Sequence, residues 1–90
     1  MFTIHFVSSR IERELQRLQA QDRTRIAIRL QQLKIDPRPQ GILALDTNIY
    51  RLRIGQFTVI YEVNDEGQEI TILRITRRNE RTYRSLDDLF

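Results

Sequence analysis

Arginines and one tyrosine are the residues best suited to chemistry in this sequence. The stretch RITRRNERTYR holds five arginines, opposed by the single carboxylate of Glu80: Arg74, Arg77, Arg78, Arg81 and Arg84. Such a dense positive cluster favours contact with phosphate groups. Tyr83 lies inside the cluster, where its ring can stack on an unpaired base or its hydroxyl can reach a reacting group. The alternative is an ordinary solvated helix, with Tyr83 packed against Leu86.

Two further arginines, Arg51 and Arg53, lie two residues apart in a predicted strand. This spacing sends both side chains to one face of the strand, while Tyr50, Leu52 and Ile54 point to the other face. Like charges on one face repel each other, so the pair favours a surface that meets a phosphate backbone. The alternative is an exposed strand on which arginine discourages edge pairing with other chains.

Other classes of site are excluded or disfavoured by composition. The chain has no cysteine and one histidine, which excludes disulfides and thiolate chemistry and argues against a clustered metal site. It has no glycine-rich phosphate loop, and we expect neither a metal nor a cofactor. Asp87 and Asp88 are sequence neighbours that would face different ways on a helix, so they make a poor acid–base pair. Any catalysis is therefore expected to use arginine and tyrosine.

The overall composition predicts one small basic domain. Its 90 residues are expected to form a single domain, residues 1–90, with net charge +3 and a pI of about 9.9. Fourteen of the fifteen basic residues are arginine, whose planar fork fits phosphate oxygens, although genomic base composition can produce the same bias. The N-terminus lacks a signal-peptide pattern, and no stretch approaches the roughly 20 apolar residues of a membrane span. We expect a cytoplasmic protein that does not contact membranes.

The first half of the chain predicts a strand and two helices. Residues 1–7 alternate as a strand, and Ser9 with Glu12 matches a capping box at a helix start. The apolar stripe of the first helix consists of Ile11, Leu15 and Leu18. Asp22 is expected to cap a second helix, whose stripe consists of Ile26, Leu30 and Leu33. The proline-containing segment DPRPQG ends that helix, and the short link between the helices predicts an antiparallel helical hairpin.

From Ile49 the apolar residues recur with period two. This pattern predicts three strands in a meander, joined by the turns GQ and NDEG. Both of the last two strands carry apolar residues on both faces, as expected for central strands beneath helices. The predicted fold is therefore α+β, in the order βααβββ, with the helical hairpin packed on a mostly antiparallel sheet.

The strand sequences carry a family resemblance. YRLRIGQFTVIYEVND followed by ITILRITRRNERTYR resembles the RelE/ParE superfamily of bacterial toxins from type II toxin–antitoxin modules. The C-terminal half matches closely, and the N-terminal half fits in its order of elements. The resemblance implies a RelE-like fold, in which the tail can form a short C-terminal helix. Within the superfamily, this sequence is more similar to the mRNA-cleaving branch.

Matching positions imply roles for individual residues. Arg51 and Arg53 occupy the two strand-cation positions of that branch, Arg78 the arginine after the last strand, and Tyr83 the tyrosine beyond it. These four are the expected catalytic residues. Four more arginines are expected to bind RNA: Arg74, Arg77, Arg81 and Arg84. Thr58 replaces the usual arginine of the central strand, Thr76 and Arg77 replace a Gly-His pair, and the spacing from Arg78 to Tyr83 needs one extra residue.

The implied activity is a ribosome-dependent mRNA endonuclease that works by metal-independent attack of a ribose 2′-hydroxyl. The expected partners are mRNA in the ribosomal A site and a cognate antitoxin, whose acidic amphipathic segment would use apolar surface beside Ile11, Leu15 and Leu18. Two alternatives stay open, because one scaffold serves several activities. One is a ParE-like inhibitor of DNA gyrase. The other is a degenerate member that binds RNA or its antitoxin without catalysis.

Overall fold

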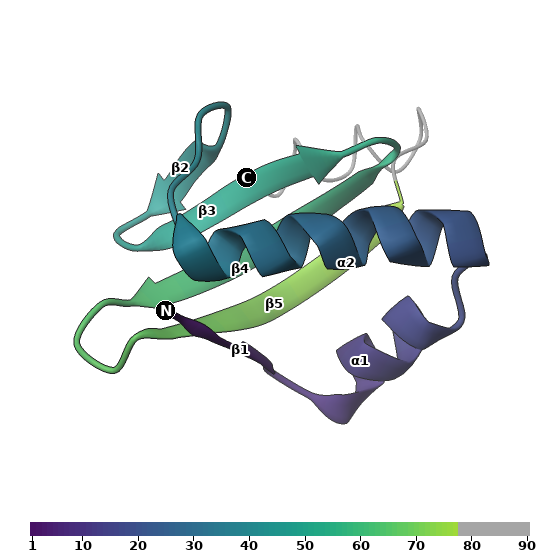
Figure 1. The fold of residues 1–90 in the computed structure, drawn as a ribbon, viewed down its shortest axis with the longest axis horizontal. Helices are drawn as coiled ribbons and strands as arrows, with labels where there is room; N and C mark the ends of the chain where they lie inside the picture. Colours follow the sequence, from purple (N-terminus) through teal and green to yellow (C-terminus); the bar gives the residue numbers. More distant parts are fainter. Residues whose placement is uncertain (78–90) are drawn as a thin grey trace.

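The computed structural model describes residues 1–77, which form a sheet of five strands and two helices (Figure 1). The elements follow in this order: β1 (Thr3–Phe6), α1 (Ser9–Gln16), α2 (Ala20–Ile35), β2 (Leu43–Asp46), β3 (Ile49–Ile54), β4 (Phe57–Asn64) and β5 (Glu69–Arg77). The predicted α+β class is confirmed, with an N-terminal strand, two helices and a mostly antiparallel sheet. None of the helices in this part of the chain has the length and apolar character needed to cross a membrane.

The strands lie in the order β1-β5-β4-β3-β2. β1 runs parallel to β5, whereas β5, β4, β3 and β2 pair antiparallel along the sheet. β4 is central, which explains why its apolar residues continue on both faces. β2 differs from the predicted βααβββ order, which had three strands after the helices. Its sequence LALD is short and pairs with β3 across an irregularity at Ala44 and Asp46, so it carries little period-two signal of its own.

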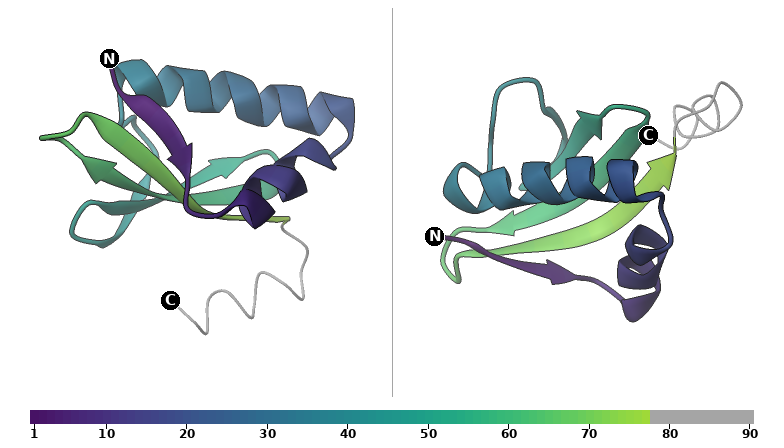
Figure 2. Two further views of the ribbon diagram at one scale, coloured as in Figure 1. Left: turned by 90° about the horizontal axis from the view of Figure 1, so that it is seen from below. Right: turned by 45° about the vertical axis from the view of Figure 1, so that its right-hand side comes forward.

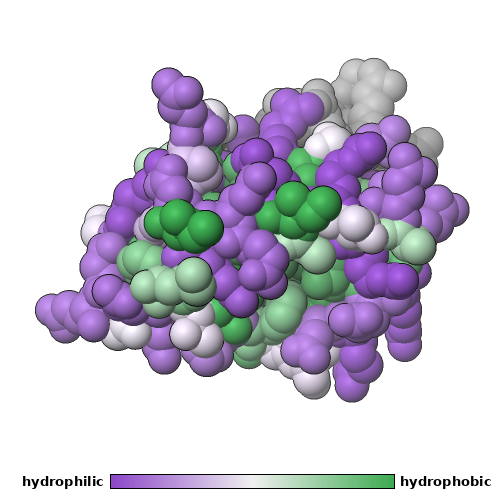
Figure 3. Space-filling model, viewed as in Figure 1, coloured by the Kyte–Doolittle hydropathy of each residue, from purple (hydrophilic) through white to green (hydrophobic). Residues whose placement is uncertain are grey.

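Helix α2 covers one face of the sheet (Figures 1 and 2). Its predicted stripe is confirmed, because Ile26, Leu30 and Leu33 are buried in the core. The sheet contributes the following buried side chains to this core: Leu52, Ile54, Phe57, Val59, Tyr61, Val63, Ile70, Ile72 and Ile75. On the outward side of α2, Ile28 and Ile35 are 53% and 77% exposed. Figure 3 shows the apolar patches of this surface separated by polar side chains.

Helix α1 lies beside the end of β5 rather than across the sheet (Figure 2). Leu15 is buried, and Ile11 and Leu18 pack against the core. The fold therefore uses Leu15 fully and Ile11 and Leu18 in part, so the predicted antitoxin contact beside this stripe stays a prediction. Arg23 of α2 donates from Nη1 to the carbonyl oxygens of Gln16 and Leu18, each at 3.2 Å, and so ties the end of α1 to α2.

Both predicted helix caps are wrong. The N-cap of α1 is Ser8, and it makes no side-chain capping bond, so the Ser9–Glu12 capping box does not form. α2 begins at Ala20, which places Asp22 inside the first turn. A carboxylate there still interacts favourably with the positive end of the helix dipole. The predicted end of α2 is correct, since the helix stops at Ile35, directly before DPRPQG.

The turn between β3 and β4 consists of Gly55 and Gln56, as the sequence predicts. Gly55 has φ +59°, a left-handed conformation that glycine adopts without strain. A Cβ at this position would also lie 2.6 Å from Nη1 of Arg25. This turn fixes the register that sets Arg51 against Ile60 and Arg53 against Thr58.

Candidate functional site

The face of the sheet that turns away from α2 gathers three of the predicted cations. Arg51 on β3 pairs with Ile60 on β4, and Ile60 pairs in turn with Arg74 on β5. Because side chains alternate along strands, Arg51, Ile60 and Arg74 point away from the side that holds the core residues. Arg53, two residues after Arg51 on β3, points to the same outer side. We call Arg51, Arg53 and Arg74 the basic face. Arg53 and Arg74 are exposed and Arg51 is half-buried.

Arg51, Ile60 and Arg74 form one row of neighbours across β3, β4 and β5. Arg53, Thr58 and Thr76 form a second row beside it. Thr58, at the position where the resemblance noted in the sequence leads us to expect an arginine, is 5% exposed. The Oγ1 of Thr76 is buried and finds no hydrogen-bond partner among the described residues. The middle of the basic face is therefore neutral, and its positive charge comes from the strands on either side.

A groove of about 720 Å³ opens next to the basic face. One wall comes from Ser8 and from Arg10 and Glu14 of α1, and another from the β2–β3 hairpin. The floor is formed by apolar side chains from the hairpin and the sheet: Leu45, Ile49, Ile60 and Leu73. Arg74 and Thr76 line both the groove and the outer sheet face. No local pattern in the sequence indicates this groove, because its walls come from segments that are more than 30 residues apart in the chain.

Arg77 does not join the basic face. It pairs with Phe57, its guanidinium lies 5.9 Å from the centre of the Phe57 ring, and its Nη2 donates to Oε1 of Gln56 at 3.3 Å. Phe57 belongs to the core on the α2 side, so Arg77 faces that side too. Four other predicted site residues lie outside the described residues: Arg78, Arg81, Tyr83 and Arg84.

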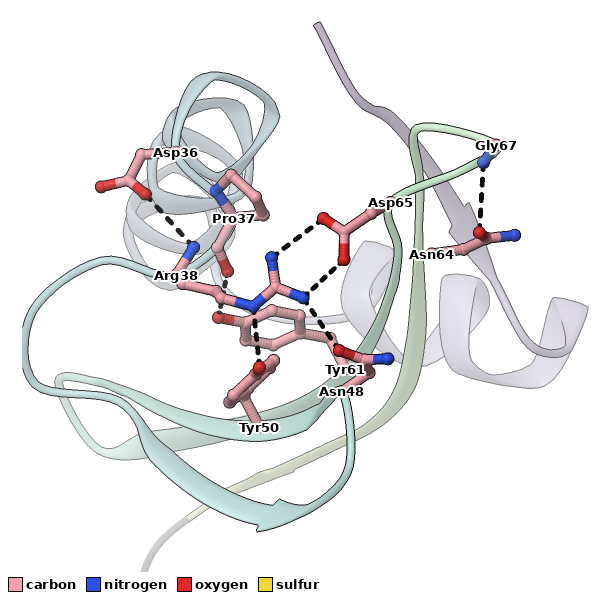
Figure 4. Close-up of polar contacts among 9 residues, drawn as sticks. All are labelled: Asp36, Pro37, Arg38, Asn48, Tyr50, Tyr61, Asn64, Asp65 and Gly67. Atoms are coloured by element: carbon pink, nitrogen blue, oxygen red, sulfur yellow. Dashed lines mark hydrogen bonds and ion pairs between the residues drawn. The ribbon is translucent and has the colours of Figure 1, made fainter.

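Arg38, in the loop between α2 and β2, holds the base of the β2–β3 hairpin (Figure 4). Its Nη1 and Nη2 donate to the two carboxylate oxygens of Asp65 at 3.0 and 2.8 Å, and Nη2 also donates to Oδ1 of Asn48 at 2.9 Å. Its Nε donates to the hydroxyl oxygen of Tyr50 at 2.7 Å. One guanidinium thus joins the loop, the β2–β3 turn and the β4–β5 turn. The hairpin wall of the groove is fixed from behind by this contact.

The Arg38–Asp65 pair shifts both groups toward their charged forms. The hydrogen bonds from Arg38 lower the pKa of the exposed Asp65 carboxyl. The hydrogen bond to Asp65, followed by that to Tyr50, raises the pKa of Arg38. Both ions therefore stay charged at neutral pH.

The two tyrosines of the described region do not supply a base to the basic face. Tyr61 is fully buried on the α2 side and donates its hydroxyl to the carbonyl oxygen of Pro37 at 2.8 Å (Figure 4). Burial, followed by the nearby Tyr50, raises the pKa of Tyr61 to about 12. The Tyr50 hydroxyl accepts from Arg38, and its ring lies 5.7 Å from the Tyr61 ring. Residues 1–77 hold no group of three or more acidic, histidine or cysteine side chains that could bind a metal ion.

Most of the chain matches one known protein family. Residues 6–82 match the family described as the ParE toxin of the type II toxin-antitoxin system parDE. The chain belongs to the ParE toxin family. Membership in the RelE/ParE superfamily, as predicted from the strand sequences, is thereby confirmed. A comparison with curated proteins gave no match.

Solved structures place this ParE-family toxin in the RelE fold. The isolated Escherichia coli RelE toxin superposes with a TM-score of 0.76 at 17% identity, over 100% of both chains. RelE in the archaeal RelE–RelB complex from Pyrococcus horikoshii OT3 gives 0.75 at 24% identity, over 88% of this chain and 97% of that one. The intact E. coli RelBE toxin–antitoxin complex gives 0.76 at 16% identity, over 89% and 100% of the respective chains. The shared architecture persists although most residues differ.

Proposed function

We propose that this toxin is a ribosome-dependent mRNA endonuclease that inhibits translation. The observation that supports the proposal best is the convergence of Arg51, Arg53 and Arg74 on one face of the sheet, beside a groove. A face with several guanidiniums and an open edge suits a single-stranded ribonucleotide backbone. The role of each residue below rests on this placement and on the family resemblance.

The proposed reaction is attack of a ribose 2′-hydroxyl on the adjacent phosphorus. The bond from phosphorus to the 5′-oxygen breaks, which leaves a cyclic phosphate on one product and a 5′-hydroxyl on the other. Negative charge grows on the phosphoryl oxygens, and Arg51, Arg53 and Arg78 are proposed to stabilise it. Removing one such donor typically lowers the rate by about 10²–10³-fold.

Proton transfer is the difficult part of this reaction. Arginine has a pKa above about 12 and tyrosine one of about 10, so neither exchanges protons readily at neutral pH. Nearby guanidiniums favour a phenolate, and we propose Tyr83 as the base and Arg78 as the charge clamp and acid. Weak proton chemistry makes the position of the substrate decisive. The proposed site of action is therefore the ribosomal A site, which holds the mRNA in place, and the toxin would act in the cytoplasm.

The proposed partner in growing cells is a cognate antitoxin. Two of the structures named above, the archaeal RelE–RelB complex and the intact E. coli RelBE complex, contain an antitoxin, and the family is described by its toxin–antitoxin system. Leu15 is buried, so apolar anchors of the antitoxin are proposed to contact the partly buried Ile11 and Leu18 of α1. An acidic segment would complement the basic face and block RNA from it.

A second candidate function is inhibition of DNA gyrase. The family match is to a ParE toxin, and the central strand carries the buried Thr58 in place of an arginine. On this interpretation the basic face contacts a protein or DNA and no bond is cleaved.

The deciding experiment is ribosome footprinting combined with mapping of mRNA 5′ ends after induction of the toxin. The endonuclease predicts new ends inside codons held in the A site, and predicts that Arg78→Ala and Tyr83→Phe abolish them. DNA breaks with SOS induction, and no new mRNA ends, would support gyrase inhibition instead. Growth without either signal would leave binding of RNA or antitoxin as the remaining function.

A further inference from the structure

The groove beside the basic face has the size and lining of a small-molecule site. Its volume of about 720 Å³ falls within the roughly 300–1,000 Å³ of typical ligand pockets. Leu45, Ile49, Ile60 and Leu73 form an aliphatic floor. Ile60 is 5% exposed yet lies outside the core cluster beneath α2, so its packing belongs to this side of the sheet. A flat apolar ring system can pack on such a floor through dispersion contacts.

Charge is distributed differently in the groove and on the basic face. The charged residues that line the groove are two arginines and two acids, and they balance: Arg10, Arg74, Glu14 and Asp46. The neighbouring strand β3 adds the cations Arg51 and Arg53. A phosphate is therefore drawn to the strands, whereas the groove suits a neutral group attached to that phosphate. A nucleotide has this combination of parts.

We propose that the groove is a nucleobase subsite for a single-stranded RNA nucleotide whose phosphate lies on the basic face, and that it prefers bases with an exocyclic amine. This inference rests on the proposed function, because it takes RNA as the ligand. The base packs on Ile60 and Leu73, and Arg74 at the rim of the groove contacts its phosphate. Glu14 of α1 and Asp46 of β2 both line the groove.

The preference follows from what a carboxylate can accept. Carboxylate oxygens accept hydrogen bonds and donate none, so they pair with the amines of cytosine, adenine and guanine. Uracil presents a carbonyl oxygen where cytosine has its amine, and that oxygen repels a carboxylate. Both acids are held in place: Oε1 of Glu14 accepts from Nε of Arg10 at 3.3 Å, and Oδ1 of Asp46 accepts from the Thr47 amide at 2.7 Å. Each carboxylate keeps further lone pairs for a ligand.

Cytidine and uridine monophosphates test the proposal as a matched pair of ligands. We would titrate each into the ¹⁵N-labelled full chain and follow amide shifts by NMR. CMP should shift the amides of Ile11, Leu73 and Thr76, and should bind about 3–10-fold more tightly than UMP, as expected for one added hydrogen bond. Glu14→Gln combined with Asp46→Asn should bring the ratio close to one. Glu12→Gln removes one negative charge from α1 outside the groove and should leave the ratio unchanged.

The outcomes separate this subsite from the function on which it rests. Shifts that map away from the groove, or equal affinity for CMP and UMP in the wild type, would overturn the subsite. If CMP fills the groove with the expected preference while induced cells show no mRNA cuts, the endonuclease fails and the subsite stands. If cuts appear while neither nucleotide shifts the groove amides, the subsite alone is wrong.

Discussion

Arg51 and Arg74 flank the same residue, Ile60, from the two strands on either side of β4. Two strand spacings separate their backbones by about 10 Å, close to the Debye length at 0.1 M salt. Their mutual repulsion is therefore largely screened in solution, and the fold tolerates the pair. The register of the sheet thus brings two arginines that are distant in the sequence to one face. We propose that a phosphate chain crossing β4 contacts both cations at once.

The first prediction concerns the contribution of Arg74 to RNA binding. Arg74→Ala should weaken binding of a short single-stranded RNA and lower the slope of log K against log salt by about 0.7, the value for one lost phosphate contact. Fluorescence anisotropy at several salt concentrations measures both effects. Arg77→Ala is the matched control, since Arg77 lies three residues further along β5 and faces the α2 side. Equal losses for both variants would show that the two faces of β5 do not differ in RNA binding.

The second prediction concerns a variant that introduces an arginine at Thr58 on the central strand β4. Thr58→Arg should raise the salt slope of RNA binding by about 0.7 and strengthen growth arrest, because the new guanidinium joins Arg53 in the same row. Thr58 is 5% exposed, so the larger side chain should also lower the free energy of unfolding by about 1–3 kcal/mol. Thr71→Arg, on β5 beyond the row, provides the control. Weaker arrest in a Thr58→Arg protein that remains folded would argue against phosphate binding at this row.

The pairing of the central strands was predictable from the sequence because local signals agreed there. The Gly55–Gln56 turn and the period-two alternation on both sides determine which residues of β3 and β4 face each other. The same alternation placed Arg51 and Arg53 on one face. The stripe of α2 was equally clear, and DPRPQG marked the end of that helix.

The remaining features depend on contacts between distant segments. β2 forms because β3 offers it an edge, not because LALD has strand periodicity. The N-caps of α1 and α2 lie one and three residues before the predicted caps, since packing of the helices can outweigh a capping bond of about 1 kcal/mol. Arg38 lies between two prolines, and nothing local indicates that it reaches Asp65, 27 residues away. The side to which Arg77 points follows from the register of the bulged β4–β5 pair, which the sequence does not reveal.

The third prediction tests the shape of the Arg38 contact. Arg38 binds Asp65 with two nitrogens and uses its remaining donors for Asn48 and Tyr50. Lysine carries the same charge but has no planar fork, so Arg38→Lys should lower the melting temperature nearly as much as Arg38→Ala. Thermal unfolding at pH 7 measures this. Arg10→Lys, which alters an exposed ion pair within α1, should have little effect. A lysine variant as stable as the wild type would mean that charge alone holds the hairpin.

The fourth prediction concerns Tyr61 and alkaline unfolding. Its pKa is raised to about 12 in the folded protein, against an ordinary value of about 10, so the folded state holds the proton more tightly than the unfolded state does. This contribution to stability is complete below about pH 10 and is lost as the pH rises through 12, by at most about 3 kcal/mol. Tyr61→Phe should be about 1 kcal/mol less stable at pH 8, because the hydrogen bond to Pro37 is lost.

The variant cannot ionise at this position, so its stability should fall less steeply above pH 10, and the two curves should approach or cross before pH 12. Urea unfolding at pH 8, 10 and 11 gives the comparison. Arginines keep their charge throughout this range, whereas Lys34 and the other tyrosines are present in both proteins and cancel in the difference. Parallel curves for the two proteins would show that the Tyr61 hydroxyl titrates alike in the folded and unfolded states. That result would mean that water reaches the Tyr61 hydroxyl next to Pro37, and it would contradict the burial of Tyr61 in the folded protein.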